Sequence, residues 1–226
     1  MTETLVQVHD ISVNFPDKKL FQNLSFDIDR REFLSVIGSN GVGKTTLIRA
    51  MLGQITPTSG EIKFREGLKI GYVPQFRNID ADYPLSIRDF VALNLQDGNF
   101  PWLNKQERAQ LDQILDETDL KSIQNTRMGR ASGGQLQKAY LAQALVDDPD
   151  LLVLDESTAS LDNERKYELL NLVQHFNEQH NLTVISITHD YALLKKYSTR
   201  YLELRPDGYQ LGMVDDIKSR EDFASV

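Results

Sequence analysis

The sequence predicts an α/β fold in which helices flank a mixed sheet, and three kinds of pattern indicate it. Short, mostly apolar runs occur at 34–37, 151–154 and 182–187. Such runs are typical of strands that are buried on both faces, as in the parallel part of an α/β sheet. Residues 5–15 alternate between apolar and polar types instead, which predicts an antiparallel layer at the N-terminus. Apolar residues at helical spacing recur within 86–146 and predict an inserted helical region.

Length and composition indicate one domain, or one domain that carries a subdomain. The chain has 226 residues, of which 40% are hydrophobic and 26% are charged. These values are ordinary for a globular protein that is large enough to bury a full core. The net charge of −8 argues against a nucleic-acid-binding protein, although a local basic patch would escape this argument.

Several classes of site and segment are not expected. The chain has no cysteine, which excludes disulfides and thiolate metal sites. Its histidines are not spaced as metal ligands usually are. The first residues, Met1–Thr4, are polar and lack the basic start of a signal peptide. No uncharged stretch approaches the ~20 apolar residues that a membrane-spanning helix needs. We therefore expect a cytoplasmic protein that reaches a membrane only through a partner.

Two strands are expected before the first buried run, at 5–15 and 20–28, with a turn at Pro16–Lys19. Phe15 lies at the end of the first strand. Its ring could stack on a nucleotide base, or it could be an ordinary core phenylalanine, and the pattern favours neither.

The buried run at 34–37 leads into a segment that fits the phosphate-binding pattern G-x-x-x-x-G-K-[ST]. Its glycines let the backbone turn tightly and bring N–H groups close to phosphate oxygens. The helix that follows, expected from Thr45 to about Leu52, would point its positive end at those phosphates. Lys44 would reach the β- and γ-phosphates, and the Thr45 hydroxyl would ligate Mg²⁺. The predicted nucleotide-binding residues are Gly38, Ser39, Asn40, Gly41, Val42, Gly43, Lys44, Thr45 and Thr46.

Short strands are expected at 61–64 and 68–73, and helices follow at 86–95 and from a capping box that begins at Asn104. A further helix is expected to begin at Ser132 and to run through Val146. Small residues with free N–H groups at a helix start can bind an anion. Without further motifs, a plain helix N-cap explains the start of this helix better than an anion site does. The segment reads Ser132, Gly133, Gly134 and Gln135.

The buried run at 151–154 ends in the carboxylates of Asp155 and Glu156. In a protein with a phosphate-binding loop, an aspartate at such a strand end holds Mg²⁺. A second carboxylate beside the γ-phosphate can polarise the attacking water. Asp162 can cap the next helix, which is expected to reach about Gln179. His189 follows the run at 182–187, at the edge where parallel α/β sheets bind ligands. A helix at 191–197, a strand at 201–204 and a hairpin turn at 207–208 complete the predicted elements.

Taken in order, these motifs resemble those of the ABC ATPases, the nucleotide-binding subunits of ABC transporters. The resemblance covers almost the whole chain. The corresponding motifs are Walker A (Gly38–Thr46), the Q-loop glutamine (Gln75), the signature motif (Ser132–Gln135), Walker B with its catalytic glutamate (Leu151–Glu156), the D-loop (Ser160–Asp162), the switch histidine (His189) and the adenine-stacking aromatic residue (Phe15).

The resemblance implies a P-loop NTPase core of the ABC type with an inserted helical subdomain. The chain would be one domain over 1–226, with the nucleotide-binding core at 1–76 and 147–226 and the helical subdomain at 77–146. Ala131, Ser157 and Gln137–Lys138 depart from the usual family pattern, but none of these departures removes a catalytic group.

The resemblance also implies a mechanism in which two copies pack head to tail and hydrolyse ATP with Mg²⁺ between them. One copy would supply Lys44, Thr45 and Asp155, and the other would supply Ser132 and Gly134. Catalysis would involve Lys44, Glu156 as the group that orients water, His189 on the γ-phosphate and Gln75 as a sensor of Mg²⁺ and water. Asp162 would bind nucleotide across the interface.

The implied partners are membrane permease subunits and an external solute-binding protein, with no nucleic acid. The protein would lie on the inner face of the cell membrane. The helical insertion would receive a cytoplasmic helix of the permease.

Residues 71–75 and 79–89 are similar to the ATPases of zinc and manganese importers, which implies a divalent metal as cargo. In this segment Arg88 and Asp89 are expected to be free for a partner. Three alternatives stay open: an ABC ATPase for another cargo or an exporter, a non-transport ABC ATPase, and a nucleotide-gated scaffold without turnover. Intact Glu156 and His189 argue against the last.

Overall fold

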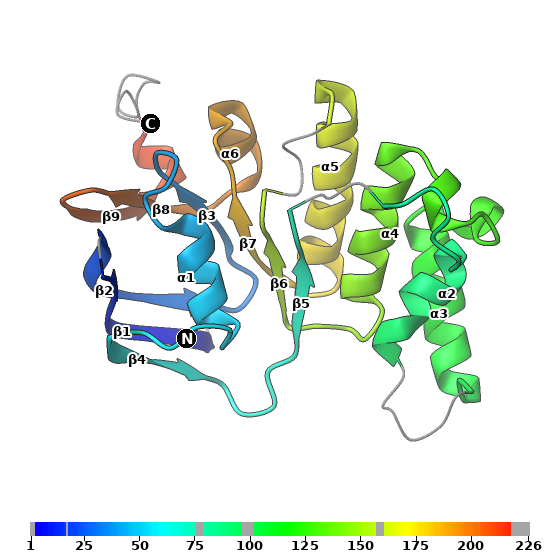
Figure 1. Ribbon diagram of the computed structural model, residues 1–226, viewed down its shortest axis with the longest axis horizontal. Coiled ribbons are helices and arrows are strands. Elements are labelled where there is room, and N and C mark those ends of the chain that lie inside the picture. Colours follow the sequence, from blue (N-terminus) through cyan, green and yellow to red (C-terminus); the bar gives the residue numbers. More distant parts are fainter. Residues whose placement is uncertain (1–2, 17, 76–78, 96–101, 157–160, 218–226) are drawn as a thin grey trace.

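The computed structural model describes residues 3–16, 18–75, 79–95, 102–156 and 161–217 (Figure 1). These residues form two sheets, with helices between and beside them. The boundary predicted at 76/77 falls outside the described residues, as do Ser157 and Ser160.

The larger sheet has six strands in the order β5–β6–β7–β3–β8–β9. Neighbours from β5 to β8 run parallel, and β9 pairs antiparallel with β8. Every residue of β3, β6 and β7 is buried, as expected for strands covered on both faces. The strands are β3 (Phe33–Ile37), β5 (Ile70–Val73), β6 (Leu151–Leu154), β7 (Thr183–Ile187), β8 (Arg200–Arg205) and β9 (Gly208–Met213).

The smaller sheet is the predicted antiparallel N-terminal layer, with the order β2–β1–β4. Its strands are β1 (Thr4–Phe15), β2 (Lys18–Asp29) and β4 (Ser59–Phe64). Helix α1 (Lys44–Met51) lies between the two sheets, because its Leu47 and Ile48 share one apolar cluster with residues from both. The helix that carries the phosphate-binding loop is thereby fixed on two sides.

Successive residues of β6 serve two different cores, as the period of a strand requires. Leu151 and Val153 belong to the cluster around α1. Leu152 and Leu154 belong to a second cluster, which includes α5 (Asn163–Gln179) and the helical region. The sheet therefore separates a phosphate-loop side from a helical side.

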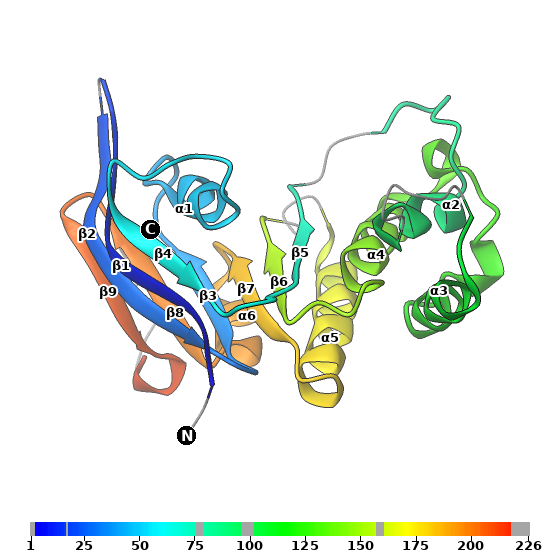
Figure 2. The same ribbon diagram turned by 90° about the horizontal axis from the view of Figure 1, so that it is seen from below.

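The helical region consists of α2 (Ile87–Ala92), α3 (Lys105–Glu117) and α4 (Gly133–Leu145). Figures 1 and 2 show it at one end of the molecule, beyond β5 and α5. The capping box expected at Asn104 is present, with the Asn104 side chain accepting from the backbone N–H of Glu107 at 2.9 Å. In the described part of the chain, no helix is both long and apolar enough to span a membrane.

Two expectations about the helical region are wrong. Arg88 and Asp89 are not free: Arg88 donates to the Asp112 carboxylate at 2.6 Å, and Asp89 accepts from the Ser86 hydroxyl at 2.5 Å. The reason is that α3 and the helix cap lie against the polar side of α2. The expected helix at 86–95 also breaks, because α2 ends at Ala92 and a 3₁₀ turn follows.

The C-terminal part differs from expectation in one element. The hairpin turn expected at 207–208 leads into a sixth strand, β9, which pairs along the whole of β8. Helix α6 (Tyr191–Tyr197) lies where the pattern predicted it.

Candidate active site

The phosphate-binding loop connects β3 to α1 and depends on glycine at its ends. Gly38 has φ +140° and Gly43 has φ +118°, in the region that side chains rarely adopt. A Cβ at position 38 would lie 2.4 Å from the carbonyl oxygen of Leu204 on β8. Gly43 is the N-cap of α1, and no side chain caps that helix. The N–H groups at the helix start are therefore left to a ligand.

Lys44 is buried inside the loop it follows. Its ammonium donates to the carbonyl oxygens of Gly38 at 2.8 Å and Ser39 at 3.0 Å. Burial lowers the pKa of Lys44, and the nearby carboxylates of Glu156 and Asp155 act in the opposite direction. The loop thus holds one cation in place beside the N–H groups.

Thr45 and Asp155 lie 110 positions apart in the sequence, yet their side chains meet. The Thr45 hydroxyl donates to Asp155 at 3.4 Å, and the Tyr72 hydroxyl donates to the other carboxylate oxygen at 3.2 Å. Burial raises the pKa of Asp155, and these two hydrogen bonds oppose the rise. A buried carboxylate beside a hydroxyl supplies the hard oxygen ligands that Mg²⁺ takes. Mg²⁺ usually completes its shell with water and substrate phosphates, so the residues present fit this ion.

Glu156 lies between the two other side chains expected at this edge. Gln75 donates to Glu156 Oε2 at 3.0 Å, and His189 Nε2 lies 3.0 Å from Oε1. The three residues follow β5, β6 and β7, which are neighbouring parallel strands. The backbone of Glu156 has φ +47°. A left-handed conformation is uncommon for a residue with a side chain, and it often accompanies function. The arrangement fixes both carboxylate oxygens at the carboxyl edge of the sheet.

Phe15 is 50% exposed at the end of β1. Of the two interpretations that the sequence allowed, the core phenylalanine is therefore wrong. An exposed ring at this position is open for stacking.

The start of α4 is capped by its own residues. The Ser132 side chain accepts from the N–H of Gln135 at 3.3 Å, and the Gln135 side chain accepts from the N–H of Ser132 at 2.9 Å. The N-cap interpretation is therefore confirmed, and it leaves the Ser132 hydroxyl proton available to donate. A Cβ at Gly133 would meet no atom of the described residues within 4 Å, whereas a Cβ at Gly134 would lie 3.3 Å from Cδ of Arg165.

The structure does not bring this segment to the phosphate-binding loop. Figures 1 and 2 show α4 and α1 on opposite sides of β6 and β7. Asp162 lies at the start of α5, where it accepts from the N–H of Arg165 at 3.0 Å. The predicted residues therefore form two groups within one chain: the loop with the strand ends, and the start of α4.

Three residues that contact the predicted site residues were not predicted. Tyr72 donates a hydrogen bond to Asp155, Lys18 donates one to the loop, and Arg165 lies beside Gly134. Tyr72 precedes Gln75 by three positions and could have been found from its place at the end of β5. For Lys18 and Arg165 the sequence carries no comparable signal, because charged residues are common in turns and at helix starts.

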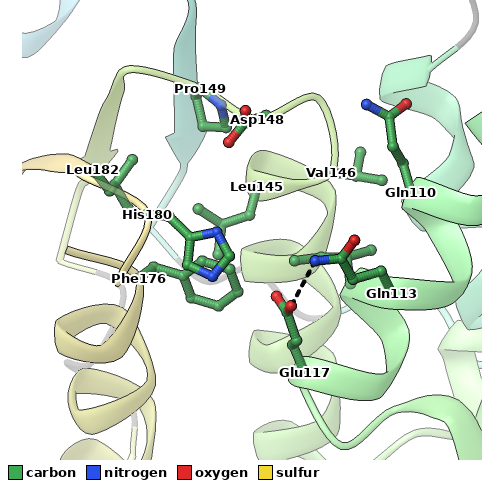
Figure 3. A pocket seen from close by; sticks show the side chains of 11 residues that line it. Gln110, Gln113, Glu117, Leu145, Val146, Asp148, Pro149, Phe176, His180 and Leu182 are labelled. Atoms are coloured by element: carbon green, nitrogen blue, oxygen red, sulfur yellow. Dashed lines mark hydrogen bonds between the residues drawn. The ribbon is translucent and has the colours of Figure 1, made fainter. Parts of the chain in front are cut away.

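A cleft of about 180 Å³ lies elsewhere, between α3 and the C-terminal ends of α4 and α5. Figure 3 shows its lining, with Gln113 hydrogen-bonded to Glu117 and with His180 close to Phe176. Part of its lining comes from residues that directly precede β6 and β7 in the chain, so the cleft lies near the amino ends of those strands. None of the predicted site residues lines this cleft.

Comparisons with known proteins agree with this geometry. Residues 21–159 match the family described as ABC transporter. A zinc import ATP-binding protein ZnuC of Rickettsia conorii is 34% identical over 226 residues, covering 100% of this chain and 94% of the relative. The ZnuC of Photorhabdus laumondii is 35% identical over 223 residues, covering 99% of this chain and 83% of the relative.

Among solved structures, one described as a metal-chelate type ABC transporter in an inward-facing conformation is similar. It has a TM-score of 0.89 and 26% identity, and the match covers 99% of this chain and 88% of that chain. With the phosphate-binding loop, the strand-end carboxylates and these matches together, the chain belongs to the ABC transporter family as an ATP-binding subunit with ATPase activity.

Proposed function

We propose that two copies of this chain pack head to tail, hydrolyse ATP with Mg²⁺ at their interface, and drive the import of a divalent metal ion. The observation that carries the dimer is the separation of the two groups of residues within one chain (Figure 1). Each group of residues could bind phosphate, but each provides only half of the contacts of a complete ATP site of the ABC ATPases. A second copy in the opposite orientation supplies the missing half of each.

In this arrangement the loop N–H groups and Lys44 bind the β- and γ-phosphates. Thr45 and Asp155, with Gln75 nearby, would hold Mg²⁺, and that ion would supply charge neutralisation on the phosphate oxygens. Glu156 orients the attacking water and accepts its proton. Glu156 accepts a hydrogen bond from Gln75, and its other carboxylate oxygen contacts His189 Nε2. These contacts keep the carboxylate pointed at the γ-phosphate, and His189 also contacts that phosphate.

The start of α4 acts on the nucleotide of the other copy. Ser132 and Gly133 are exposed, and Gly134 is partly covered by Arg165. We infer that the Ser132 hydroxyl and the N–H groups of this helix start reach a phosphate that comes from outside the chain. The helix dipole favours an anion at this end. Asp162, at the start of α5, would contribute across the same interface.

A groove on the helical region is proposed as the permease contact. It has a volume of about 610 Å³, and Trp102 and Leu93 at its rim are 77% and 42% exposed. An exposed tryptophan beside apolar side chains is a typical anchor for a partner helix. Because Arg88 and Asp89 have partners within the chain, recognition would depend on this apolar surface more than on their charges. The groove is lined by Leu85, Arg88, Asp89, Ala92, Leu93, Trp102, Leu103, Arg108 and Leu111.

The metal cargo is supported by the relatives, whose names give zinc import, and by the similarity of 71–75 and 79–89 to the zinc and manganese importers. An external solute-binding protein and a position on the inner face of the membrane belong to the same proposal. A transporter for another cargo is the second candidate.

To test this, the permease that co-purifies with the chain is identified, and the complex of the two is reconstituted in nanodiscs. ATP hydrolysis should rise when the cognate binding protein is loaded with Zn²⁺ or Mn²⁺, and not when that protein is empty. The matched variant is Trp102→Ala, which should lower this stimulation and leave ATP binding intact. Stimulation by a sugar or peptide binding protein would replace the metal with another cargo. If the rate of ATP hydrolysis did not depend on the permease or the binding protein, that would argue against coupling of hydrolysis to transport.

A further inference from the structure

Lys18 contacts the phosphate-binding loop from outside. It is the first residue of β2, and its ammonium donates to the carbonyl oxygen of Gly41 at 2.7 Å. Further along β2, Leu20 and Phe21 lie 3.3 and 3.1 Å from where a Cβ at Gly43 would be. The start of β2 therefore touches the loop at two glycines, once with a cation and once with apolar side chains.

Lys18 also stands beside the exposed ring of Phe15. The two residues are directly paired in the β1–β2 ladder. Directly paired residues of antiparallel strands project their side chains from the same face. The hairpin thus presents an aromatic ring and an ammonium together, and the ammonium reaches the loop.

The charges around the loop indicate why a second cation there would favour nucleotide binding. The chain carries a net charge of −8, and Asp155 and Glu156 act on Lys44 inside the site. Lys44 is already shared between two loop carbonyls. A nucleotide polyphosphate entering this site gains from a further positive charge at the loop.

We propose that Lys18 is a positioning residue of the nucleotide site, one that holds the Gly41 turn and places a positive charge beside the ribose and α-phosphate of bound ATP. This inference rests on the proposed function of the loop and of Phe15. If the base lies on Phe15 and the β- and γ-phosphates lie in the loop, the part of the nucleotide between them passes Lys18. ATP and ADP share that part, so both should depend on Lys18 to the same degree.

The experiment compares Lys18→Ala, Lys18→Arg and Lys19→Ala in the full chain. Lys19 is the matched control, because it is the adjacent lysine, is also exposed, and projects to the opposite face of the strand. Affinities for ADP and for a non-hydrolysable ATP analogue are measured by calorimetry, and KM and kcat by steady-state hydrolysis. Lys44→Ala is carried alongside as a test of the loop itself.

Lys18→Ala should weaken ADP and ATP-analogue binding by the same factor, about 5- to 10-fold, as expected for losing one charge-assisted contact. KM for ATP should rise to a similar extent with kcat nearly unchanged, and the effect should shrink at high salt. Lys18→Arg should retain most of the affinity, and Lys19→Ala should resemble the unmodified chain.

If Lys18→Ala and Lys19→Ala bind equally well while Lys44→Ala does not bind, the role of Lys18 is refuted and the loop assignment stands. If Lys44→Ala binds ATP normally, the proposed function fails and takes this inference with it. A drop in kcat at constant KM would likewise overturn the positioning role.

Discussion

The phosphate-binding loop and the start of α4 are both glycine-rich helix starts, yet they are built differently. Gly43 gives α1 no side-chain cap, and the loop encloses the ammonium of Lys44. Ser132 and Gln135 form a capping box at the start of α4, and no atom of the described residues lies within 4 Å of where a Cβ at Gly133 would be. The loop therefore leaves the N–H groups of its helix start to a ligand. The start of α4 is capped by its own side chains, and in the head-to-tail arrangement that we propose it would face the other copy.

The largest effect is expected from a substitution that removes the proposed catalytic carboxylate beside the phosphate-binding loop. Glu156→Gln should keep ATP binding, because the loop is unchanged, and should slow hydrolysis by about 10²-fold or more. The variant should accumulate as an ATP-bound dimer, seen by size-exclusion chromatography with ATP and Mg²⁺. Glu164→Gln, an exposed acid in the first turn of α5, is the control. Turnover at the normal rate would move the base role to another residue.

The next substitution tests whether the start of α4 acts outside its own chain. Ser132→Asp keeps a good N-cap, so the free energy of unfolding should change by less than about 0.5 kcal/mol. The added negative charge faces the incoming phosphate, and turnover should fall by about 10²-fold while each monomer still binds ATP.

Mixing Ser132→Asp protein with Lys44→Ala protein should restore hydrolysis. Each heterodimer would contain one site with an intact loop and an intact Ser132. The readout is ATP turnover as a function of mixing ratio. No recovery at any ratio, with both variants folded, would speak against the head-to-tail arrangement.

A smaller effect concerns the stability of the loop side. The pKa of Asp155 is raised in the fold by burial, so the folded chain holds that proton more tightly than the unfolded chain. Its favourable contribution is full below the unfolded pKa and is lost as the pH rises through the folded pKa. Asp155→Asn should therefore stabilise the nucleotide-free chain at neutral pH, by about 1 kcal/mol, and Mg²⁺-dependent hydrolysis should fall.

The measurement is thermal unfolding of both proteins between pH 4 and pH 8. The difference in Tm should widen toward neutral pH. A constant difference would mean that the carboxylate is as well accommodated as the amide, and that burial is not what perturbs it.

The smallest effect concerns the exposed ring. Phe15→Ala should weaken binding of ATP by about 3- to 10-fold, the range for one aromatic contact, and Phe15→Tyr should not. The same change should leave binding of inorganic triphosphate untouched, which separates the base from the phosphates. Equal losses for both ligands would place the effect in the loop instead.

The fold could largely be predicted because its strong signals are local. A buried strand, a glycine turn and a helix start all lie within 34–51, and the carboxylates directly follow β6. The rule that ligands bind at the carboxyl edge of a parallel sheet indicated His189, the acidic end of a buried run indicated Glu156, and Gln75 came from the resemblance to the ABC ATPases.

Contacts that depend on how distant elements pack could not be predicted in detail. The hydrogen bond from Arg88 to Asp112 requires knowing that α3 lies on the polar side of α2. The bond from Lys18 to Gly41 requires the position of a hairpin relative to the loop. Phe15 was ambiguous for the same reason, since alternation gives the face of a strand but not what covers its end.

The order of strands in the larger sheet also constrains how the chain can fold as it is synthesised. Strand β3 is flanked by β7 and β8, which emerge roughly 150 residues after it, about 8–30 s later at ordinary synthesis rates. Until then β3 has neither of its hydrogen-bonding neighbours, and pairings of such long sequence separation form slowly. The N-terminal hairpin can close early, whereas the phosphate-binding loop acquires its support on β8 only near the end of translation. Premature termination before β8 would therefore leave an apolar strand exposed, and we expect such fragments to depend on chaperones and to aggregate.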